Sequence, residues 1–239
     1  FCNIYSSFMQ RAYDNVIHDV AIQDLPVVMC LDRGGLVGED GVTHHGVFDM
    51  AAFGAVPGLT IAAPMNEPEL RNMMYTALGS GHPFMIRYPR GHGEGLPWRG
   101  EKFETLPVGR GRRLREGADV ALLTVGTVGN AAARAAGRAA AEGVSVAHYD
   151  LRFVKPLDEA LLDEVGRKFR RVVTVEDGSL RGGVGEAVAA FFNGRGYDVR
   201  VQRLGIGDEW VEHGTPGQLY ALCGYDEEGI LRALLDTRA

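Results

Sequence analysis

Short apolar runs of the kind that form β-strands alternate with helical segments along almost the whole chain, and this alternation constrains the fold most. In the first half, strand-like runs at 27–31, 59–63 and 84–87 are interleaved with the helical spacing of apolar residues at 6–22 and 67–78. Parallel strands need a crossover connection, usually a helix, so this order predicts a parallel sheet covered by helices.

A stretch rich in Gly, Pro and charged residues at 91–108 has neither the helical nor the strand period. The alternation then resumes, with strands expected at 120–125, 144–149, 172–176 and 199–204 and helices at 129–141, after Pro156, at 184–193 and twice near the C-terminus. The sequence therefore predicts an α/β protein with two parallel-sheet-based domains at 1–100 and 113–239, joined by a linker at 101–112.

The charge and cysteine content exclude several functional classes. Up to residue 108 there are seven basic and 12 acidic residues, and the remainder has 18 and 19, so neither half has the basic surplus that nucleic-acid binding needs. No apolar run approaches the roughly 18 residues of a membrane span. Cys2, Cys30 and Cys223 lack neighbours at metal-ligand spacing, so no metal ligands are expected in this chain.

The long polar loop at 36–49 is the first place where chemistry is expected. It carries Asp40 and His44 among glycines, which allow the backbone to approach a ligand closely. On spacing alone, a surface loop with an incidental His pair, His44 and His45, is the stronger interpretation.

Arg87 and Arg90 follow a predicted strand, at the edge where parallel sheets place their ligands. A guanidinium group suits a phosphate or a carboxylate, because it binds either anion with two parallel hydrogen bonds. For Arg87 an ion pair with a nearby acid is an equally good alternative. Phe8 and Arg11, three residues apart, share one face of the opening helix, although core packing of Phe8 is the simpler reading of that pattern.

Five stretches, in order along the whole chain, resemble signature sequences of the 1-deoxy-D-xylulose-5-phosphate synthase family. They lie at 5–20, 32–46, 87–91, 151–158 and 205–216. This family belongs to the transketolase-like enzymes that use thiamine diphosphate. The resemblance implies a partial transketolase-like pyrimidine-binding domain, with its N-terminal part missing, followed by a transketolase C-terminal domain.

The resemblance also implies an activity. The family condenses pyruvate with D-glyceraldehyde 3-phosphate to 1-deoxy-D-xylulose 5-phosphate, releases carbon dioxide, and supplies isoprenoid and thiamine biosynthesis. Such transferases are homodimers in the cytoplasm, or in the plastid of a plant.

Site residues follow from the matching positions. Phe8 would stack on the aminopyrimidine ring of the cofactor, with Tyr5 lining the same pocket, while Arg11 and Arg90 would hold the substrate phosphate.

Asp40 and His44 would face the reacting carbons and act as the catalytic pair. His44 is preferred to His45 because Thr-His is the recurrent pattern in the family. Val42 stands where relatives commonly have proline, which leaves the loop conformation open.

Two parts of the family's active site have no counterpart in this sequence. The glutamate that activates the cofactor and the Gly-Asp-Gly motif that binds Mg²⁺ and the diphosphate lie upstream of this segment in the family. The chain begins at Phe1, within a strand-like run, as a fragment, a processed chain or one half of a split enzyme would. The chain alone is therefore predicted to be inactive, with the N-terminal half of the enzyme as its partner and as the source of ligands for thiamine diphosphate and Mg²⁺.

Two other readings remain open. The chain could be the β-type subunit of another thiamine-diphosphate enzyme, a 2-oxo acid dehydrogenase or a transketolase. It could also be a non-catalytic dimerisation module on the same fold, since fold does not fix function.

Overall fold

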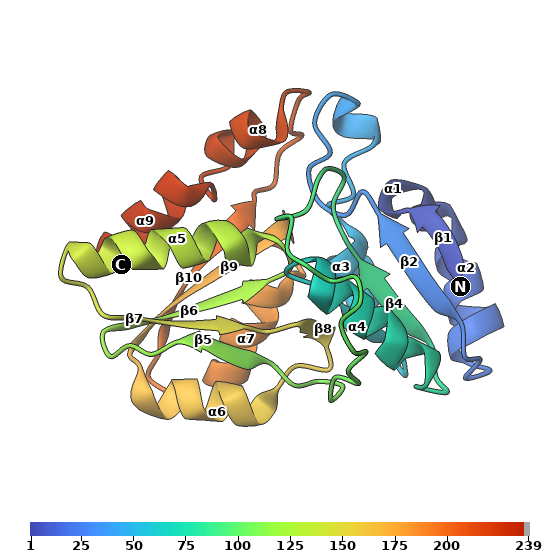
Figure 1. Cartoon of the computed structure of the whole chain (residues 1–239), viewed down its shortest axis with the longest axis horizontal. Coiled ribbons are helices and arrows are strands. Elements are labelled where there is room, and N and C mark those ends of the chain that lie inside the picture. Colours follow the sequence, from blue (N-terminus) through green and yellow to red (C-terminus); the bar gives the residue numbers. More distant parts are fainter. Residues whose placement is uncertain (237–239) are drawn as a thin grey trace.

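Two β-sheets lie side by side in the computed structural model, which describes residues 1–236 (Figure 1). The first sheet is parallel except for its last strand, and its order is β1 (Cys2–Tyr5), β2 (Val28–Asp32), β4 (Phe84–Arg87), β3 (Thr60–Ala62) and β8 (Phe153–Lys155). Its inner strands β2 and β4 are largely buried, because helices cover both faces of the sheet.

One face of this sheet packs against the opening helical stretch and α3 (Asp49–Gly54). The sequence predicts one regular helix at 6–22, but the structure divides that stretch into four short turns of different pitch. They are α1 (Ser6–Met9), the 3₁₀ turn η1 (Gln10–Ala12), α2 (Tyr13–Asn15) and the π turn η2 (Val16–Ala21). Departures of this kind from α-helical geometry are frequent at functional sites.

The other face is covered by α4 (Glu67–Leu78), whose predicted bounds are confirmed. Its start is well defined, because the Asn66 side chain accepts a hydrogen bond from the Glu69 backbone N–H at 3.1 Å. It ends before Gly79.

The second sheet has the order β10 (Arg200–Ile206), β9 (Arg171–Ser179), β6 (Val120–Val125), β7 (Val146–Asp150) and β5 (Arg112–Arg115). Only β5 is antiparallel to its neighbour. One face carries α5 (Val128–Ala141), α8 (Pro216–Leu222) and α9 (Glu227–Leu235), and the other carries α6 (Glu159–Lys168) and α7 (Val184–Gly194), as Figure 1 shows. The predicted fold class, two α/β domains with parallel-based sheets, is confirmed.

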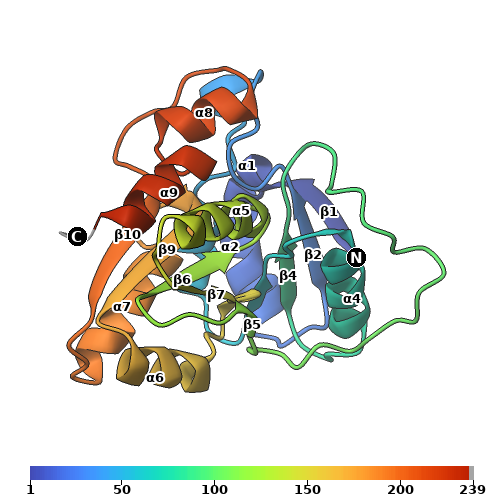
Figure 2. The same cartoon turned by 60° about the vertical axis from the view of Figure 1, so that its left-hand side comes forward.

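The two halves are joined by more than a connecting segment. Strand β8, from the second half of the sequence, pairs antiparallel with β3 and completes the first sheet. The connection after β4 runs as a long loop past α4 (Figure 2), where the Arg71 guanidinium donates hydrogen bonds to the carbonyls of Glu101 and Lys102.

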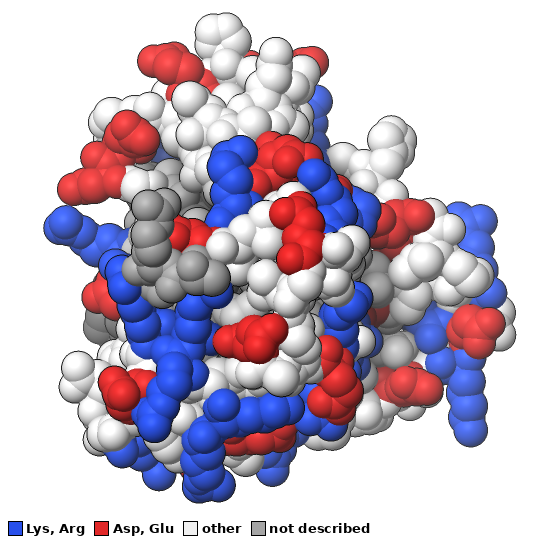
Figure 3. All heavy atoms as spheres, turned by 90° about the vertical axis from the view of Figure 1, so that its left-hand side faces the viewer, with Lys and Arg blue, Asp and Glu red and all other residues white. Residues whose placement is uncertain are grey.

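The face drawn in Figure 3 carries basic and acidic side chains interspersed, without a broad area of one sign. Within residues 1–236, no helix combines the length and the apolar content that crossing a bilayer requires.

Candidate active site

The opening turns place three of the predicted residues on one exposed face. The rings of Tyr5 and Phe8 are stacked, with their centroids 5.1 Å apart, and the Arg11 guanidinium lies 5.9 Å from the Phe8 centroid. Phe8 is 38% exposed whereas the next residue, Met9, is 4% exposed. Met9 therefore faces the core and Phe8 does not, so an aromatic surface is available for a planar ligand.

The loop between β2 and α3 brings the Asp/His pair to this face. Its two ends are held together by backbone hydrogen bonds between Gly35 and Gly46, at 2.7 and 2.8 Å, and the turn η3 (Gly41–Thr43) lies at its tip. His44 lies edge-on to Phe8, with ring centroids 5.4 Å apart. The imidazole and the exposed aromatic ring are thus in direct contact.

The second predicted arginine reaches the same loop. Arg90 Nη1 donates a hydrogen bond to Asp40 Oδ2 at 3.2 Å, and both side chains are about 40% exposed, at 40% and 43%. An ion pair this open to solvent contributes about 0–1 kcal/mol, so an incoming anion can replace the carboxylate at little cost.

These contacts form two groups at the carboxyl ends of β1, β2 and β4: Tyr5, Phe8, Arg11 and His44 in one, and Asp40 with Arg90 in the other. Tyr5 ends β1, the loop follows β2, and Arg90 follows β4. A cavity of about 500 Å³ opens beside Arg90, between the domains, and Tyr88, Arg134 and Tyr220 also line it.

His45 differs from His44 in a way that supports a structural role. It is 5% exposed, its Nδ1 accepts a hydrogen bond from the Val37 N–H at 3.1 Å, and its Nε2 lies 3.3 Å from the Glu212 carbonyl oxygen. Nδ1 is therefore engaged within the loop, and Nε2 ties the loop to the C-terminal domain.

Arg87 is buried and does not face the site. It is 5% exposed, and its Nε donates to both carboxylate oxygens of Asp49 at 2.9 and 3.0 Å. Of the two alternatives that the sequence left open for Arg87, the structure shows the ion pair.

Arg33 is a further candidate, which the sequence analysis does not single out. Its guanidinium carbon lies 3.7 Å from the Tyr5 ring centroid, and its Nη1 pairs with Asp32 at 2.6 Å. Its Nε is buried and has no hydrogen-bond partner within residues 1–236. Its backbone has a φ of 59°, unusual for a residue with a side chain, and such strain is concentrated at functional sites. The position of this arginine directly after a strand was the available signal.

Within the described residues, no group of three or more His, Cys, Asp or Glu side chains could hold a metal ion. The site thus offers an aromatic surface, an imidazole, a carboxylate and guanidinium groups.

The fold and this arrangement define a two-domain α/β protein with its candidate ligand groups at the carboxyl ends of parallel strands. Two family models match it: the transketolase pyrimidine binding domain at residues 1–94 and the transketolase C-terminal domain at residues 109–230. The chain belongs to the transketolase family.

Within that family, its similar relatives are 1-deoxy-D-xylulose-5-phosphate synthases, as the sequence resemblance predicted. The chain is 60% identical to the synthase of Bacteroides fragilis over 240 residues, which is 100% of this chain and 37% of the relative. Identity is also 60% with the synthase of Bacteroides thetaiotaomicron, covering 98% and 36%, and 48% with that of Symbiobacterium thermophilum, covering 95% and 35%. The chain therefore spans little more than a third of the length of these relatives.

A solved structure described as a split gene transketolase, inactive beta4 tetramer, has the same architecture. It superposes with a TM-score of 0.86 at 26% identity, and covers 97% of this chain and 74% of that one.

Proposed function

We propose that this chain supplies the pyrimidine-binding and C-terminal domains of an enzyme that condenses pyruvate with D-glyceraldehyde 3-phosphate. The products would be 1-deoxy-D-xylulose 5-phosphate and carbon dioxide, in the cytoplasm, for isoprenoid and thiamine biosynthesis. The observation that carries the proposal is the contact between Phe8 and His44. Asp40, which pairs with Arg90, lies in the same loop as His44.

Thiamine diphosphate fits the aromatic surface. Its aminopyrimidine ring would lie against Phe8, with Tyr5 stacked behind, and a planar heterocycle gains most from such a half-exposed ring. When bound, this cofactor supplies the electron sink for carbon–carbon bond formation. The protein residues supply orientation and electrostatic stabilisation.

The phosphate of glyceraldehyde 3-phosphate would be held by Arg11 and Arg90, with Arg33 as a further guanidinium beside Tyr5. In this proposal the phosphate displaces the Asp40 carboxylate from Arg90. His44 would hold or deliver a proton at the oxygen of the reacting carbonyl, since the ring nitrogens of an imidazole can both donate and accept a proton.

The ligands of Mg²⁺ and of the cofactor diphosphate would come from the part of the enzyme that relatives have beyond this chain. Two observations support this view: the chain spans 37% of its Bacteroides fragilis relative, and residues 1–236 contain no metal-ligand cluster. The neighbouring structure is described as a split gene transketolase in an inactive beta4 tetramer. We propose that this chain alone is likewise inactive and assembles with the diphosphate-binding part as a dimer.

Calorimetric titration of thiamine diphosphate with Mg²⁺ tests the proposal. The chain would be titrated alone and after mixing with the diphosphate-binding part of the Bacteroides fragilis relative, and binding is expected only in the mixture. Phe8→Ala should weaken that binding by about tenfold, from the loss of roughly 1–2 kcal/mol of ring stacking.

Tyr13→Ala is the matched control, because Tyr13 is 37% exposed on the same helical stretch and contacts Phe53 instead of Phe8. Equal losses of cofactor affinity in Phe8→Ala and Tyr13→Ala would count against a cofactor site at Phe8. So would the absence of binding by the wild-type chain both alone and in the mixture.

The 26% identity with the split-gene protein favours a second candidate, the β-type subunit of a transketolase. In that case Arg90→Ala should barely alter the use of the aldehyde phosphate. Under the main proposal the same variant raises its KM by tenfold or more, since a charge-assisted contact is worth about 1.5–3 kcal/mol.

A further inference from the structure

The proposed site is assembled from three separate segments of the first domain: the opening turns, the loop at 36–49 and the turn after β4. A buried carboxylate joins the first to the third. Asp49, which is 3% exposed, accepts a hydrogen bond from the Ser6 hydroxyl at 3.0 Å and pairs with Arg87 Nε. Ser6 directly follows Tyr5, and Arg87 lies three residues before Arg90.

The Arg87 guanidinium also contacts the loop at 36–49 and the second domain. Arg87 Nη2 donates to the Asp177 carbonyl oxygen at 2.9 Å and to the Gly46 carbonyl oxygen at 3.3 Å. Gly46 closes the loop by pairing with Gly35. The planar guanidinium of Arg87 therefore contacts three segments in a fixed geometry, which the flexible ammonium group of a lysine could not do.

The Asp177 side chain, contributed by β9 of the second sheet, holds the other arm of the loop. Its Oδ1 accepts from the Leu36 N–H at 3.0 Å and from the Tyr225 hydroxyl at 2.8 Å. A Cβ at Gly35 would lie 1.9 Å from Asp177 Oδ2, so the loop backbone is in close contact with this carboxylate. The second domain thus fixes the segment that carries Asp40.

We propose that Arg87, Asp49 and Asp177 form a clamp that sets the spacing between the substrate-binding arginines and the Asp/His loop, so that the C-terminal domain determines affinity for the phosphorylated substrate. These three are positioning residues, because none is exposed to the site. The inference rests on the proposed function, and its expected signature is a rise in KM for the aldehyde phosphate. A misplacement of about 1 Å can cost up to 100-fold in such sites.

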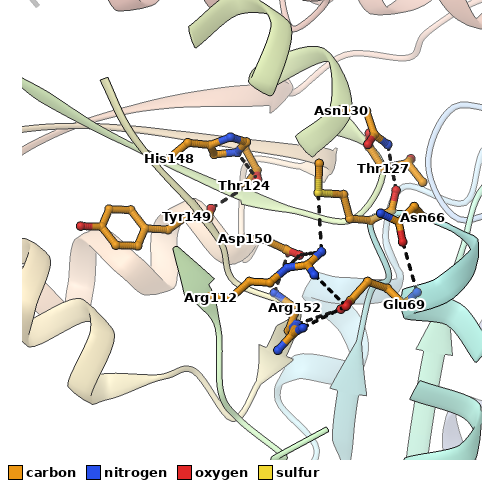
Figure 4. A network of polar contacts seen from close by, with 11 residues as sticks. Asn66, Glu69, Arg112, Thr124, Thr127, Asn130, His148, Tyr149, Asp150 and Arg152 are labelled. Carbon is orange, nitrogen blue, oxygen red and sulfur yellow. Dashed lines mark hydrogen bonds and ion pairs between the residues drawn. The ribbon is translucent and has the colours of Figure 1, made fainter. Parts of the chain in front are cut away.

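A second buried contact between the domains provides a matched control. Arg152 binds Glu69 of α4 through Nε and Nη2, at 2.8 and 2.9 Å (Figure 4), and neither residue belongs to any of the three site segments. Replacing Arg152 with Lys removes a comparable pair of guanidinium hydrogen bonds between the same two domains. A purely structural effect should therefore be equal for Arg87→Lys and Arg152→Lys.

The experiment measures steady-state kinetics of the full chain assembled with the diphosphate-binding part of the Bacteroides fragilis relative. Arg87→Lys keeps a charge for Asp49 but loses the contacts to Gly46 and Asp177. We expect KM for D-glyceraldehyde 3-phosphate to rise about tenfold, while kcat changes less than about threefold. Arg152→Lys should leave this KM within about twofold of wild type at a similar loss of thermal stability.

Arg90→Ala separates the clamp from the function on which it rests. If Arg90→Ala leaves the aldehyde KM unchanged, the proposed function fails. If Arg90→Ala raises it while Arg87→Lys behaves like Arg152→Lys, the clamp is overturned.

Should Arg87→Lys fail to fold, Ser6→Ala removes a single donor to Asp49 and leaves the ion pair in place. A rise of about threefold in the aldehyde KM is then expected, and an unchanged value refutes the clamp.

Discussion

Glu69 pairs with two arginines of the second domain, and its removal gives a quantitative test of how the two domains are held together. Its carboxylate accepts hydrogen bonds from Arg112 Nη1 at 2.8 Å and from the Arg152 fork, and its side chain is 7% exposed (Figure 4). Removing one partner of a buried pair costs about 3–5 kcal/mol.

The lower end of that range applies to Glu69→Ala. Arg112 retains Asp150, whose Oδ2 accepts from its Nε at 3.1 Å, and the arginine side chain is 29% exposed, so water can solvate it. Arg152 is more buried, at 14%, and loses both of its bonds to the carboxylate. We therefore expect a loss of about 3 kcal/mol, equivalent to a decrease in Tm of about 6–12 °C for a chain of this size.

The pH dependence of Glu69→Gln has a defined sign. Burial, helped by the neighbouring Glu69 charge, raises the pKa of Asp150 to about 6, against the lowering effect of Arg112. Asp150 thus holds more proton in the folded protein than in the unfolded chain between pH 4 and 6, so the contribution of Asp150 to stability falls as pH rises through that window. Removing the Glu69 charge lowers the Asp150 pKa and reduces the fall. The decrease in the free energy of unfolding caused by Glu69→Gln should consequently be smaller at pH 7.5 than at pH 5.

Urea unfolding followed by far-UV circular dichroism at both pH values measures these quantities. Glu142→Ala, an exposed position after α5, serves as the control. A destabilisation by Glu69→Ala within about 0.5 kcal/mol of the control would refute the reasoning, because it would mean that water replaces the buried contact at no cost.

Two further predictions concern the loop and the second sheet. Gly35→Ala places a Cβ 1.9 Å from Asp177 Oδ2 at a φ of 87°, and it should abolish cofactor binding by the assembled enzyme in calorimetry. The control is Gly58→Ala, where φ is 74° and the space around the new Cβ is open. That variant should only lower Tm slightly. Burial lowers the pKa of His148 to about 4, helped by nearby arginines, so the contribution of His148 to stability is lost as pH falls from 6.5 to 4, by up to about 3 kcal/mol. His148→Leu removes the titrating group and should reduce this loss of stability at low pH, as measured by urea unfolding. The Thr124 hydroxyl stays satisfied in the variant, because it still donates to the Tyr149 carbonyl oxygen. An unchanged loss would assign the acid sensitivity to other groups.

Much of the fold could be predicted from periodicity and end signals. The bounds of α4 and β4 agree with the sequence prediction because an Asn cap, a Gly stop and β-branched or aromatic residues define them locally. Strand β8 was missed because three residues carry no period, and only its pairing with β3 makes it a strand. The first helix was predicted as regular because apolar spacing does not distinguish α from 3₁₀ or π turns.

The candidate site was predicted unevenly. Phe8 could not be separated from a core residue by spacing, and only the family resemblance favoured its exposure. Arg87 and Arg90 share the same strand end, yet one is buried against Asp49 and the other is 40% exposed. Their different environments depend on Asp49 and Asp177, which lie 38 and 90 residues away from Arg87. Contacts at such separations leave no local pattern.

The dependence of the site on the second domain follows from the same long-range contacts. A loop rich in glycine has high conformational entropy when free, and fixing its backbone costs about 1–2 kcal/mol per residue. Gly35 and Gly41 occupy positive φ values that few other residues tolerate, so side chains from elsewhere must define the loop. Asp177 and the Glu212 carbonyl, both from the second half, contact Leu36 and His45 at its two arms. The transketolase C-terminal domain therefore acts as the scaffold that makes a flexible sequence present Asp40 and His44 in one conformation.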